Sequence, residues 1–387
     1  MTGEPLVDVR CPVRHTEVVP CDAAEVSPLL AHLAAGRSPD GLPDGGRFPR
    51  GTLTPDGRLD LCKQSLGTAH AVRIVQALQG NPHVRSLMLG TDAIGDDGAR
   101  AVAALACANP VLETLYLGCN NIGPDGAHRL SESLVDAPGV TGLWLKRNPI
   151  GDAGALSLAD LLRRNPRLRV LDLVNTGLGD AGVQALATAL CEAERGLRHL
   201  YLSGNGLGPS ATPALARVLR GAPSLLGLYL SVNRLGDAGA RLLAAALADN
   251  RTLRCLELAS NGLGAGAGDL LAAVAAHPAL EVLNLGYAAS TRVLGACAND
   301  LRLVAVDVAR AVSASRTLRC VDLTRTGLAG ADLDLLFEAA LRSPTLVDLR
   351  ITGPLPKRVA DALAARRERH GVPAVPRELA SIRSVYR

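Results

Sequence analysis

The sequence predicts an α/β solenoid, a right-handed horseshoe of about eleven repeats with a parallel sheet on the concave face and helices on the convex face. The motif L-x-x-L-x-L-x-x-N-x-I/L-G returns every 28 residues, give or take one, except for a single step of 38. The first half of each copy alternates like a strand, and the second half has helical spacing. A single copy cannot bury its own leucine face, so the copies are expected to stack.

Each strand is expected around the first strand leucine of its copy. In LETLYLGCNNIGPDGA, Leu115 and Leu117 are predicted to point inward and Tyr116 outward. The equivalent positions are Leu59, Leu87, Leu115, Leu143, Leu171, Leu200, Leu228, Leu256, Leu283, Val321 and Leu349.

An asparagine ends the strand half of most copies and is predicted to hydrogen-bond the buried turn backbone, one rung per repeat. The rungs are Asn120, Asn148, Asn205, Asn233 and Asn261, with Thr176 and Thr326 in two copies. Glycines follow where the chain turns into the helix. Each helix then shows apolar spacing such as Ala127, Leu130 and Leu134.

Over residues 58–353 these motifs resemble ribonuclease-inhibitor-type leucine-rich-repeat proteins, a subclass with units of 28 or 29 residues and full helices on the convex side. The resemblance implies the horseshoe fold. Members include ribonuclease inhibitors, sensor regions of immune receptors, Ran GTPase-activating proteins and bacterial effectors. The resemblance therefore implies the fold strongly and the function weakly.

The flanking regions do not match the repeat. Residues 1–57 are interpreted as an N-terminal cap, with a helix around residues 23–35 and a hairpin turning at Pro55-Asp56-Gly57. Residues 354–387 are interpreted as a C-terminal cap helix, Lys357–His370, followed by a basic tail. Arg366, Arg367 and Arg369 are expected to lie on the solvated face of that helix.

Charge and cysteine usage limit the classes of partner and the compartment. The tail from residue 354 carries eight Lys/Arg and three Asp/Glu, so the solenoid itself is nearly neutral although the chain as a whole is at +4. A nucleic-acid surface would be basic along its length, so nucleic acid is not predicted. Nine cysteines without disulfide spacing, together with no signal segment, indicate the cytoplasm. No run of apolar residues is long enough to span a membrane, so no membrane partner is predicted.

The sequence predicts no catalytic or cofactor site. Neither a phosphate-binding loop nor a nucleophile elbow occurs. Cys11, His15, Cys21 and His32 could be read as metal ligands, but they lack the closely paired spacing of zinc sites, so no metal is predicted.

The candidate binding site is the row of outward strand positions on the concave face. The row contains four of the eight aromatic residues, and an exposed aromatic row indicates a protein-binding surface. The alternative is that the rings only stack across strands, Tyr201 on Tyr229. The row and its flanking residues are Met88, Tyr116, Trp144, Lys146, Arg147, Asp172, His199, Tyr201, Tyr229 and Glu257.

The ninth repeat carries an insertion, GYAASTRVLGACA, between Leu285 and Asn299. Insertions in repeat proteins map to loops, often on the binding side, so Tyr287 and Arg292 are further candidates. The alternative is an ordinary surface loop, since long loops lower stability only slightly.

The function predicted from these features is a non-enzymatic interaction scaffold that binds a protein partner on the concave face. Trp144→Ala is expected to leave the fold intact and weaken this binding. The alternative function is a GTPase-activating protein similar to the Ran GTPase-activating family, with Arg147 neutralising the transferring phosphate. That family has an acidic C-terminal tail, whereas this tail is basic.

Overall fold

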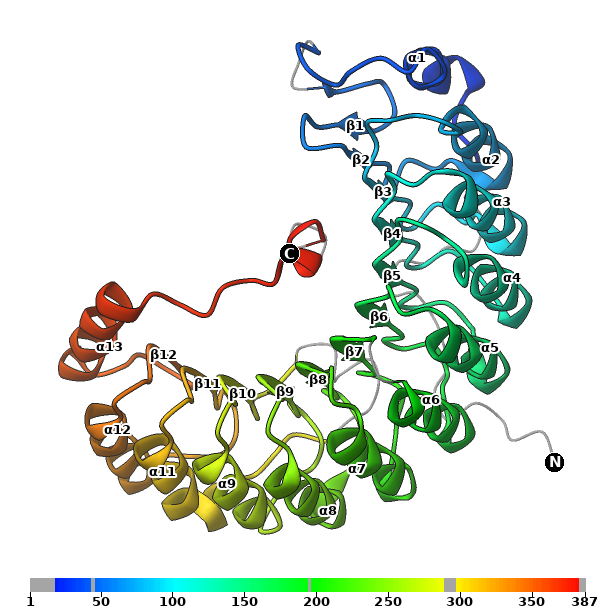
Figure 1. The fold of residues 1–387 in the computed structure, drawn as a ribbon. Coiled ribbons are helices and arrows are strands. Elements are labelled where there is room, and N and C mark those ends of the chain that lie inside the picture. The colour runs from blue at the N-terminus through cyan, green and yellow to red at the C-terminus, as the bar shows by residue number, and fades with distance from the viewer. Residues whose placement is uncertain (1–17, 43–45, 194–195, 289–296, 383–387) are drawn as a thin grey trace. The chain divides into compact units, whose positions relative to one another are not determined.

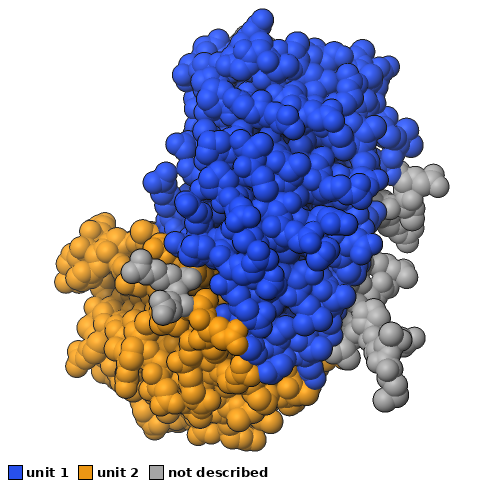
Figure 2. Space-filling view, turned by 45° about the vertical axis from the view of Figure 1, so that its right-hand side comes forward, with its two compact units in different colours: residues 1–189, 375–387 blue, residues 190–374 orange. Residues whose placement is uncertain are grey.

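The computed structural model describes residues 18–42, 46–193, 196–288 and 297–382. It divides into two compact units, one formed by residues 1–189 and 375–387 and the other by residues 190–374 (Figure 2). The boundary falls within one helix, α6. In each unit, repeat helices cover one face of a sheet and leave the other face free of them (Figure 1).

The first unit holds strands β1 to β6, which pair in chain order. β1 and β2 are antiparallel, and the strands from β2 to β6 are parallel. The strands are β1 (Thr52–Leu53), β2 (Arg58–Asp60), β3 (Ser86–Met88), β4 (Thr114–Tyr116), β5 (Gly142–Trp144) and β6 (Val170–Asp172). The helices are α1 (Ala23–Ala34), α2 (Gly67–Ala77), α3 (Gly95–Ala108), α4 (Pro124–Leu134), α5 (Gly151–Arg164), α6 (Asp180–Glu192) and α14 (Arg377–Ala380).

The second unit repeats the plan with parallel strands β7 to β12. The strands are β7 (His199–Tyr201), β8 (Gly227–Tyr229), β9 (Cys255–Glu257), β10 (Val282–Asn284), β11 (Cys320–Asp322) and β12 (Asp348–Arg350). The helices are η2 (Pro209–Ala211), α7 (Thr212–Gly221), α8 (Gly236–Asp249), α9 (Ala267–Ala276), η3 (Arg302–Val304), α11 (Ala305–Ala314), α12 (Ala331–Arg342) and α13 (Lys357–His370).

The predicted α/β solenoid class is confirmed. Each of the eleven predicted strand positions is the middle residue of one strand from β2 to β12. These middle residues point toward the helices and form the core, as Leu87, Leu115 and Leu143 show by being fully buried. The alternation of the motif therefore decides which face each side chain takes.

The predicted terminal elements are also present. α1 begins with a capping box, in which Asp22 accepts from the Ala24 N–H at 2.8 Å and Glu25 accepts from the Asp22 N–H at 3.1 Å. β1 and β2 form the hairpin expected around residues 55–57, and α13 has the predicted bounds. The division into an N-terminal cap, a solenoid and a C-terminal cap remains a prediction.

The asparagine rungs hydrogen-bond the turn backbone, as predicted. The Asn148 carbonyl accepts from the N–H groups of Asn120 and Ile122 at 2.8 and 3.1 Å. Its amide donates to the carbonyls of Leu117 and Leu145, both at 2.9 Å. Asn299 resumes the pattern after the insertion, since its amide donates to the Leu285 carbonyl at 2.7 Å.

Two structural contacts were not predicted. Asp152, in the first turn of α5, accepts from the N–H groups of Gly179 and Gly182 in the next repeat at 2.7 and 3.0 Å. The expectation that Arg366 is solvated is wrong, because Arg366 is buried and donates to the carbonyls of Ala340 and Leu341 at 2.9 and 2.7 Å. Its guanidinium satisfies the end of α12, where carbonyls lack helical partners.

Candidate functional site

The predicted aromatic row lies on the helix-free face of the sheet, in two groups that belong to different units. We call the group in the first unit the first patch: Met88, Tyr116, Trp144, Lys146, Arg147 and Asp172. Strand pairing sets Met88 beside Tyr116, and Trp144 beside Asp172. We call the group in the second unit the second patch: His199, Tyr201, Tyr229, Glu257 and Tyr287.

The prediction that the row is exposed is wrong for most of its members. Met88 and Trp144 are 0% exposed, and Tyr116 is 4% exposed. Asp172, His199 and Tyr229 are also buried. Tyr201, Glu257, Lys146 and Arg147 keep part of their surface accessible. A protein partner could therefore contact only some of the predicted residues directly.

Glycines explain why these rings are buried. A Cβ added at Gly142 would lie 2.3 Å from the Trp144 ring, which shows that the ring lies flat over this glycine. A Cβ at Gly90 would lie 2.5 Å from the Tyr116 ring for the same reason. The missing side chains leave room for each ring to lie down on the sheet instead of pointing into solvent. A glycine two residues before the aromatic, as in Gly142-Leu143-Trp144, is the sequence signal that was overlooked.

Polar groups border the first patch. The Lys146 ammonium nitrogen lies 5.9 Å from the centre of the Tyr116 ring, a cation–π distance. Burial lowers the pKa of Lys146, while the negative charge of Asp172 acts in the opposite direction. Arg147 is partly exposed and takes a left-handed backbone conformation with φ of 57°. The Trp144 indole N–H is buried and, within the described part of the chain, has no hydrogen-bond partner.

The second patch is built on a stacked pair of tyrosines. The rings of Tyr201 and Tyr229 lie 3.8 Å apart and within 5° of parallel, so the stacking alternative describes their geometry correctly. The Tyr229 hydroxyl and the His199 Nδ1 lie 3.3 Å apart. Tyr201 forms the accessible side of the stack, because Tyr229 is buried beneath it.

Acidic groups lie beside this stack. Loss of solvent contact raises the pKa of Glu257 to about 7, and Asp322 raises it further whereas Arg350 lowers it. Tyr287 is half-buried, and the Arg325 guanidinium lies 5.1 Å from the centre of its ring. Arg292, the other candidate from the insertion, lies outside the described residues.

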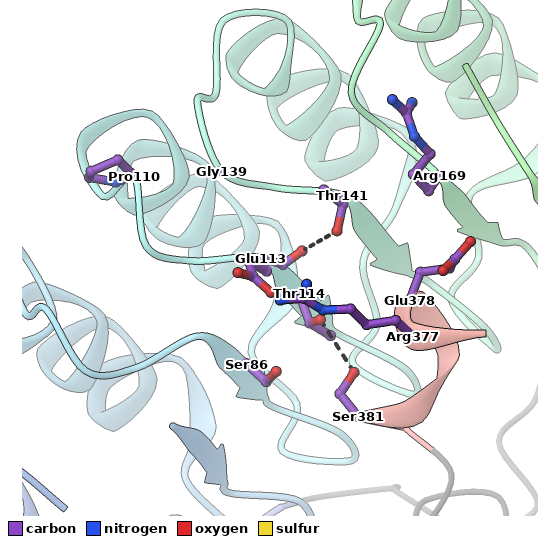
Figure 3. A pocket seen from close by; sticks show the side chains of 10 residues that line it. All are labelled: Ser86, Pro110, Glu113, Thr114, Gly139, Thr141, Arg169, Arg377, Glu378 and Ser381. Atoms are coloured by element: carbon purple, nitrogen blue, oxygen red, sulfur yellow. Dashed lines mark hydrogen bonds between the residues drawn. The ribbon is translucent and has the colours of Figure 1, made fainter. Parts of the chain in front are cut away.

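The sequence analysis did not predict a pocket that lies at the N-terminal ends of the strands in the first unit. It has a volume of about 410 Å³ and lies where strands β3 to β6 begin (Figure 3). We call it the strand-start pocket. Ser86, Glu113, Thr114, Thr141 and Arg169 line it on the strand side, and Arg377, Glu378 and Ser381 line it on the side of the C-terminal segment. The C-terminal segment has no periodic pattern that could have predicted this position.

Other kinds of site were sought in the described part of the chain. No cluster of three or more His, Cys, Asp or Glu side chains there could hold a metal ion. Cys11 and His15 lie outside it. No helix among the described residues is both long enough and apolar enough to cross a membrane.

Comparison with known proteins identifies the repeat. A family model described as the leucine-rich repeat matches residues 108–131, 164–187 and 249–272. Each matched segment runs from the end of one helix through a strand into the next helix. No curated protein matches the chain.

Solved structures give weak likenesses. Leiomodin-1 actin-binding site 2 aligns over 38% of this chain and 78% of its own, with 19% identity and a TM-score of 0.33. The tropomodulin C-terminal domain of Caenorhabditis elegans aligns over 43% and 92%, with 16% identity and a TM-score of 0.35. The yeast Rad7–Elc1 complex contributes a chain that aligns over 70% and 69%, with 18% identity and a TM-score of 0.41. At such scores no functional conclusion follows.

Proposed function

We propose that the chain, three segments of which match the leucine-rich-repeat family model, is a non-enzymatic module of the ribonuclease-inhibitor-like type that binds a protein partner on the helix-free face of its sheet. A parallel sheet covered by helices on one side offers its other side as an extended surface.

The observation that carries the proposal is the Tyr201–Tyr229 stack. Tyr201 is already held at 3.8 Å from its neighbour, so binding would immobilise little additional side-chain freedom. Part of its surface is accessible, and tyrosines in such positions often dominate binding energy. In this proposal Tyr201 is the anchor, and the partly exposed Glu257 lies near it on the same face. Trp144, Tyr116 and Met88 support the fold instead of touching the partner.

The test is an affinity capture from the lysate of the source organism, read by mass spectrometry, followed by a measured affinity for the captured protein. Tyr201→Ala is expected to weaken binding by about 30-fold, the equivalent of about 2 kcal/mol at an interface anchor. Arg241→Ala, which changes an exposed side chain on helix α8, is the matched control and should bind as the wild type does.

Two outcomes would contradict the proposal. Equal binding by Tyr201→Ala and wild type would show that Tyr201 is not the anchor, provided that circular dichroism shows that both proteins are folded. Loss of binding in Arg241→Ala would place the interface on the helices. If the captured partner is a GTPase, its hydrolysis rate with wild type and with Arg147→Ala would test the enzymatic alternative.

A further inference from the structure

The C-terminal segment belongs to the first unit although the chain just before it belongs to the second. Among the described residues, 375–382 belong to the first unit, whereas residues 190–374 belong to the second. Within this segment α14 and Ser381 lie against the beginning of strands β3 to β6 (Figure 3). Packing of a chain end on a distant part of the sequence requires contacts that offset the entropy lost on ordering it.

Two kinds of contact hold the segment. The hydroxyl oxygens of Ser381 and Thr114 lie 3.3 Å apart, within hydrogen-bond distance. Ile382 is only 3% exposed, although it lies close to the chain end. The burial of an isoleucine side chain contributes about 1.5–3 kcal/mol. The segment therefore has both a polar and an apolar attachment.

Charge adds complementarity across the strand-start pocket. Arg377 of the segment and Glu113 of the strand side line the pocket together, and the Arg377 side chain extends toward Glu113 and Thr114 (Figure 3). Glu378 and Arg169 provide a second pair of opposite charges in the same pocket. The Glu113 carboxylate is already paired with the Arg85 guanidinium at 2.7 Å, so Arg377 adds a second positive charge to this side of the pocket.

The attachment is local and short. α14 has four residues, and a helix of this length has little stability of its own. Residues 371–376, which precede it, form no helix or strand. Val372 and Val375 in this stretch are 56% and 42% exposed. A segment with so few buried groups can open at a small fraction of the free energy of global unfolding.

We propose that the strand side of the strand-start pocket is a peptide-binding surface and that the chain's own C-terminal segment, Arg377–Ile382, is its ligand, held in cis and exchangeable. The cavity is the space left between this surface and the segment. The tether raises the effective concentration of the segment to about the millimolar range, so a weak intrinsic affinity suffices to cover the surface. A segment of another molecule with the same order of basic, acidic, small polar and apolar side chains could enter only when the tail leaves. This inference does not depend on the proposed function, because it concerns the N-terminal ends of strands β3 to β6 and not Tyr201.

The experiment compares two aspartate substitutions in the full-length protein. Ile382→Asp places a charge at the buried anchor, and Ala380→Asp places the same charge two residues away on an exposed position. Hydrogen exchange of the amides from Glu378 to Ile382 is measured by mass spectrometry. Exchange should accelerate at least tenfold in Ile382→Asp and stay at the wild-type rate in Ala380→Asp. Equal rates in all three proteins would overturn the docking of the segment.

A second measurement tests whether the pocket accepts a ligand. A fluorescent peptide with the sequence of residues 375–387 is titrated into each full-length protein and followed by anisotropy. It should bind Ile382→Asp at least tenfold more tightly than wild type, because only in the variant is the strand side of the pocket left uncovered by the chain's own segment. Adding Thr114→Val to Ile382→Asp should weaken this binding, since the hydroxyl partner of Ser381 is lost. Equal binding to wild type and Ile382→Asp, or binding unaffected by Thr114→Val, would overturn the assignment of the pocket.

Discussion

The two patches carry aromatic side chains at the same strand position, yet they hold them differently. Trp144 lies flat on Gly142 and is 0% exposed, and Tyr229 is likewise buried over Gly227. The residue two positions before Tyr201 is His199 and not a glycine, and Tyr201 keeps part of its surface accessible. The comparison teaches that a glycine two residues earlier turns a sheet-face aromatic into part of the fold. At Tyr116 position 114 is a threonine, and Gly90 of the preceding repeat leaves the space instead, so this ring is also buried.

The largest effect is expected when the side chains of Trp144 and Tyr201 are truncated to alanine. Trp144→Ala is expected to lower the free energy of unfolding by about 3–5 kcal/mol, as for a buried aromatic, whereas Tyr201→Ala should lower it by about 1 kcal/mol. Urea denaturation provides both values. Trp144→Phe is the control, and it should lose only part of this stability, because it keeps a buried ring and the indole N–H has no partner within the described part of the chain. Equal losses for the two alanine variants would abolish the distinction between the patches.

The two units also differ in the residues that occupy the rung positions. The first unit has Asp92 where other repeats have asparagine, and Asp92 is fully buried. Burial raises the pKa of Asp92 from 3.8 to about 7, although the backbone N–H groups of Leu66 and Gln64 lower it. The folded state therefore holds a proton that the unfolded state releases above pH 4. The stability from this proton is complete below pH 4 and is lost as the pH rises through 7.

Asp92→Asn should remove this dependence. The variant is expected to gain stability over wild type by about 1.4 kcal/mol for each pH unit between pH 4 and 7. Urea denaturation of both proteins at pH 5 and pH 7.5 measures the change. Replacing Asn233 of the second unit by aspartate should introduce the same dependence there. A constant difference between Asp92→Asn and wild type at the two pH values would show that Asp92 is ionised in the folded state.

Filling the space under the Trp144 ring tests whether the glycine is the reason why this ring is buried. Gly142→Ala places a methyl group 2.3 Å from the Trp144 ring, so the ring must lift. We expect a loss of about 1–3 kcal/mol, as for an overpacked site. A red shift of Trp144 fluorescence should accompany this loss, since Trp144 is the single tryptophan. Gly208→Ala is the matched control, because the nearest atom to an added Cβ there is 4.0 Å away. A stable Gly142→Ala with unchanged fluorescence would contradict the role assigned to the glycine.

The smallest effect is expected from the chain end. Deleting residues 375–387 removes the burial of Ile382 but also the entropy lost on ordering the segment, so stability should fall by about 1 kcal/mol or less. Hydrogen exchange should locate any change at β3 and β4 in the first unit, leaving the second unit as it was. Faster exchange spread over β7 to β12 would show that the segment has a different role.

The repeat motif predicted the strand centres and the asparagine rungs because these depend on local alternation and on one turn shape. Leu143 and Asn148 occupy the positions expected of them for that reason. Exposure of Trp144 could not be predicted from alternation alone, since it depends on the volume left by Gly142. The glycine was visible in the sequence, but its meaning required the ring's orientation.

The remaining features depend on contacts between distant residues. The docking of Ser381 near Thr114 joins positions 267 residues apart, and no periodicity encodes it. The link from Asp152 to Gly179 joins neighbouring repeats, and the repeated Gly-Asp pairs could have suggested it. Arg366 was misjudged because a basic residue near a helix end was assigned to solvent. In the structure it satisfies the carbonyls at the end of α12.

The asparagine rungs link the repeats in one direction, because each asparagine side chain bonds the repeat before it. The side chain of Asn148 reaches back to Asn120, Ile122 and Leu117 of the preceding repeat, and Asn233 reaches back in the same way to Asn205 and Leu207. Removing a repeat from the C-terminal side therefore strips the preceding turn of its partner, whereas removing one from the N-terminal side leaves the following turn with its own. A chain pulled from its C-terminal end would therefore lose the partner of each turn before the turn itself, whereas a chain pulled from its N-terminal end would lose each turn before the asparagine that bonds it.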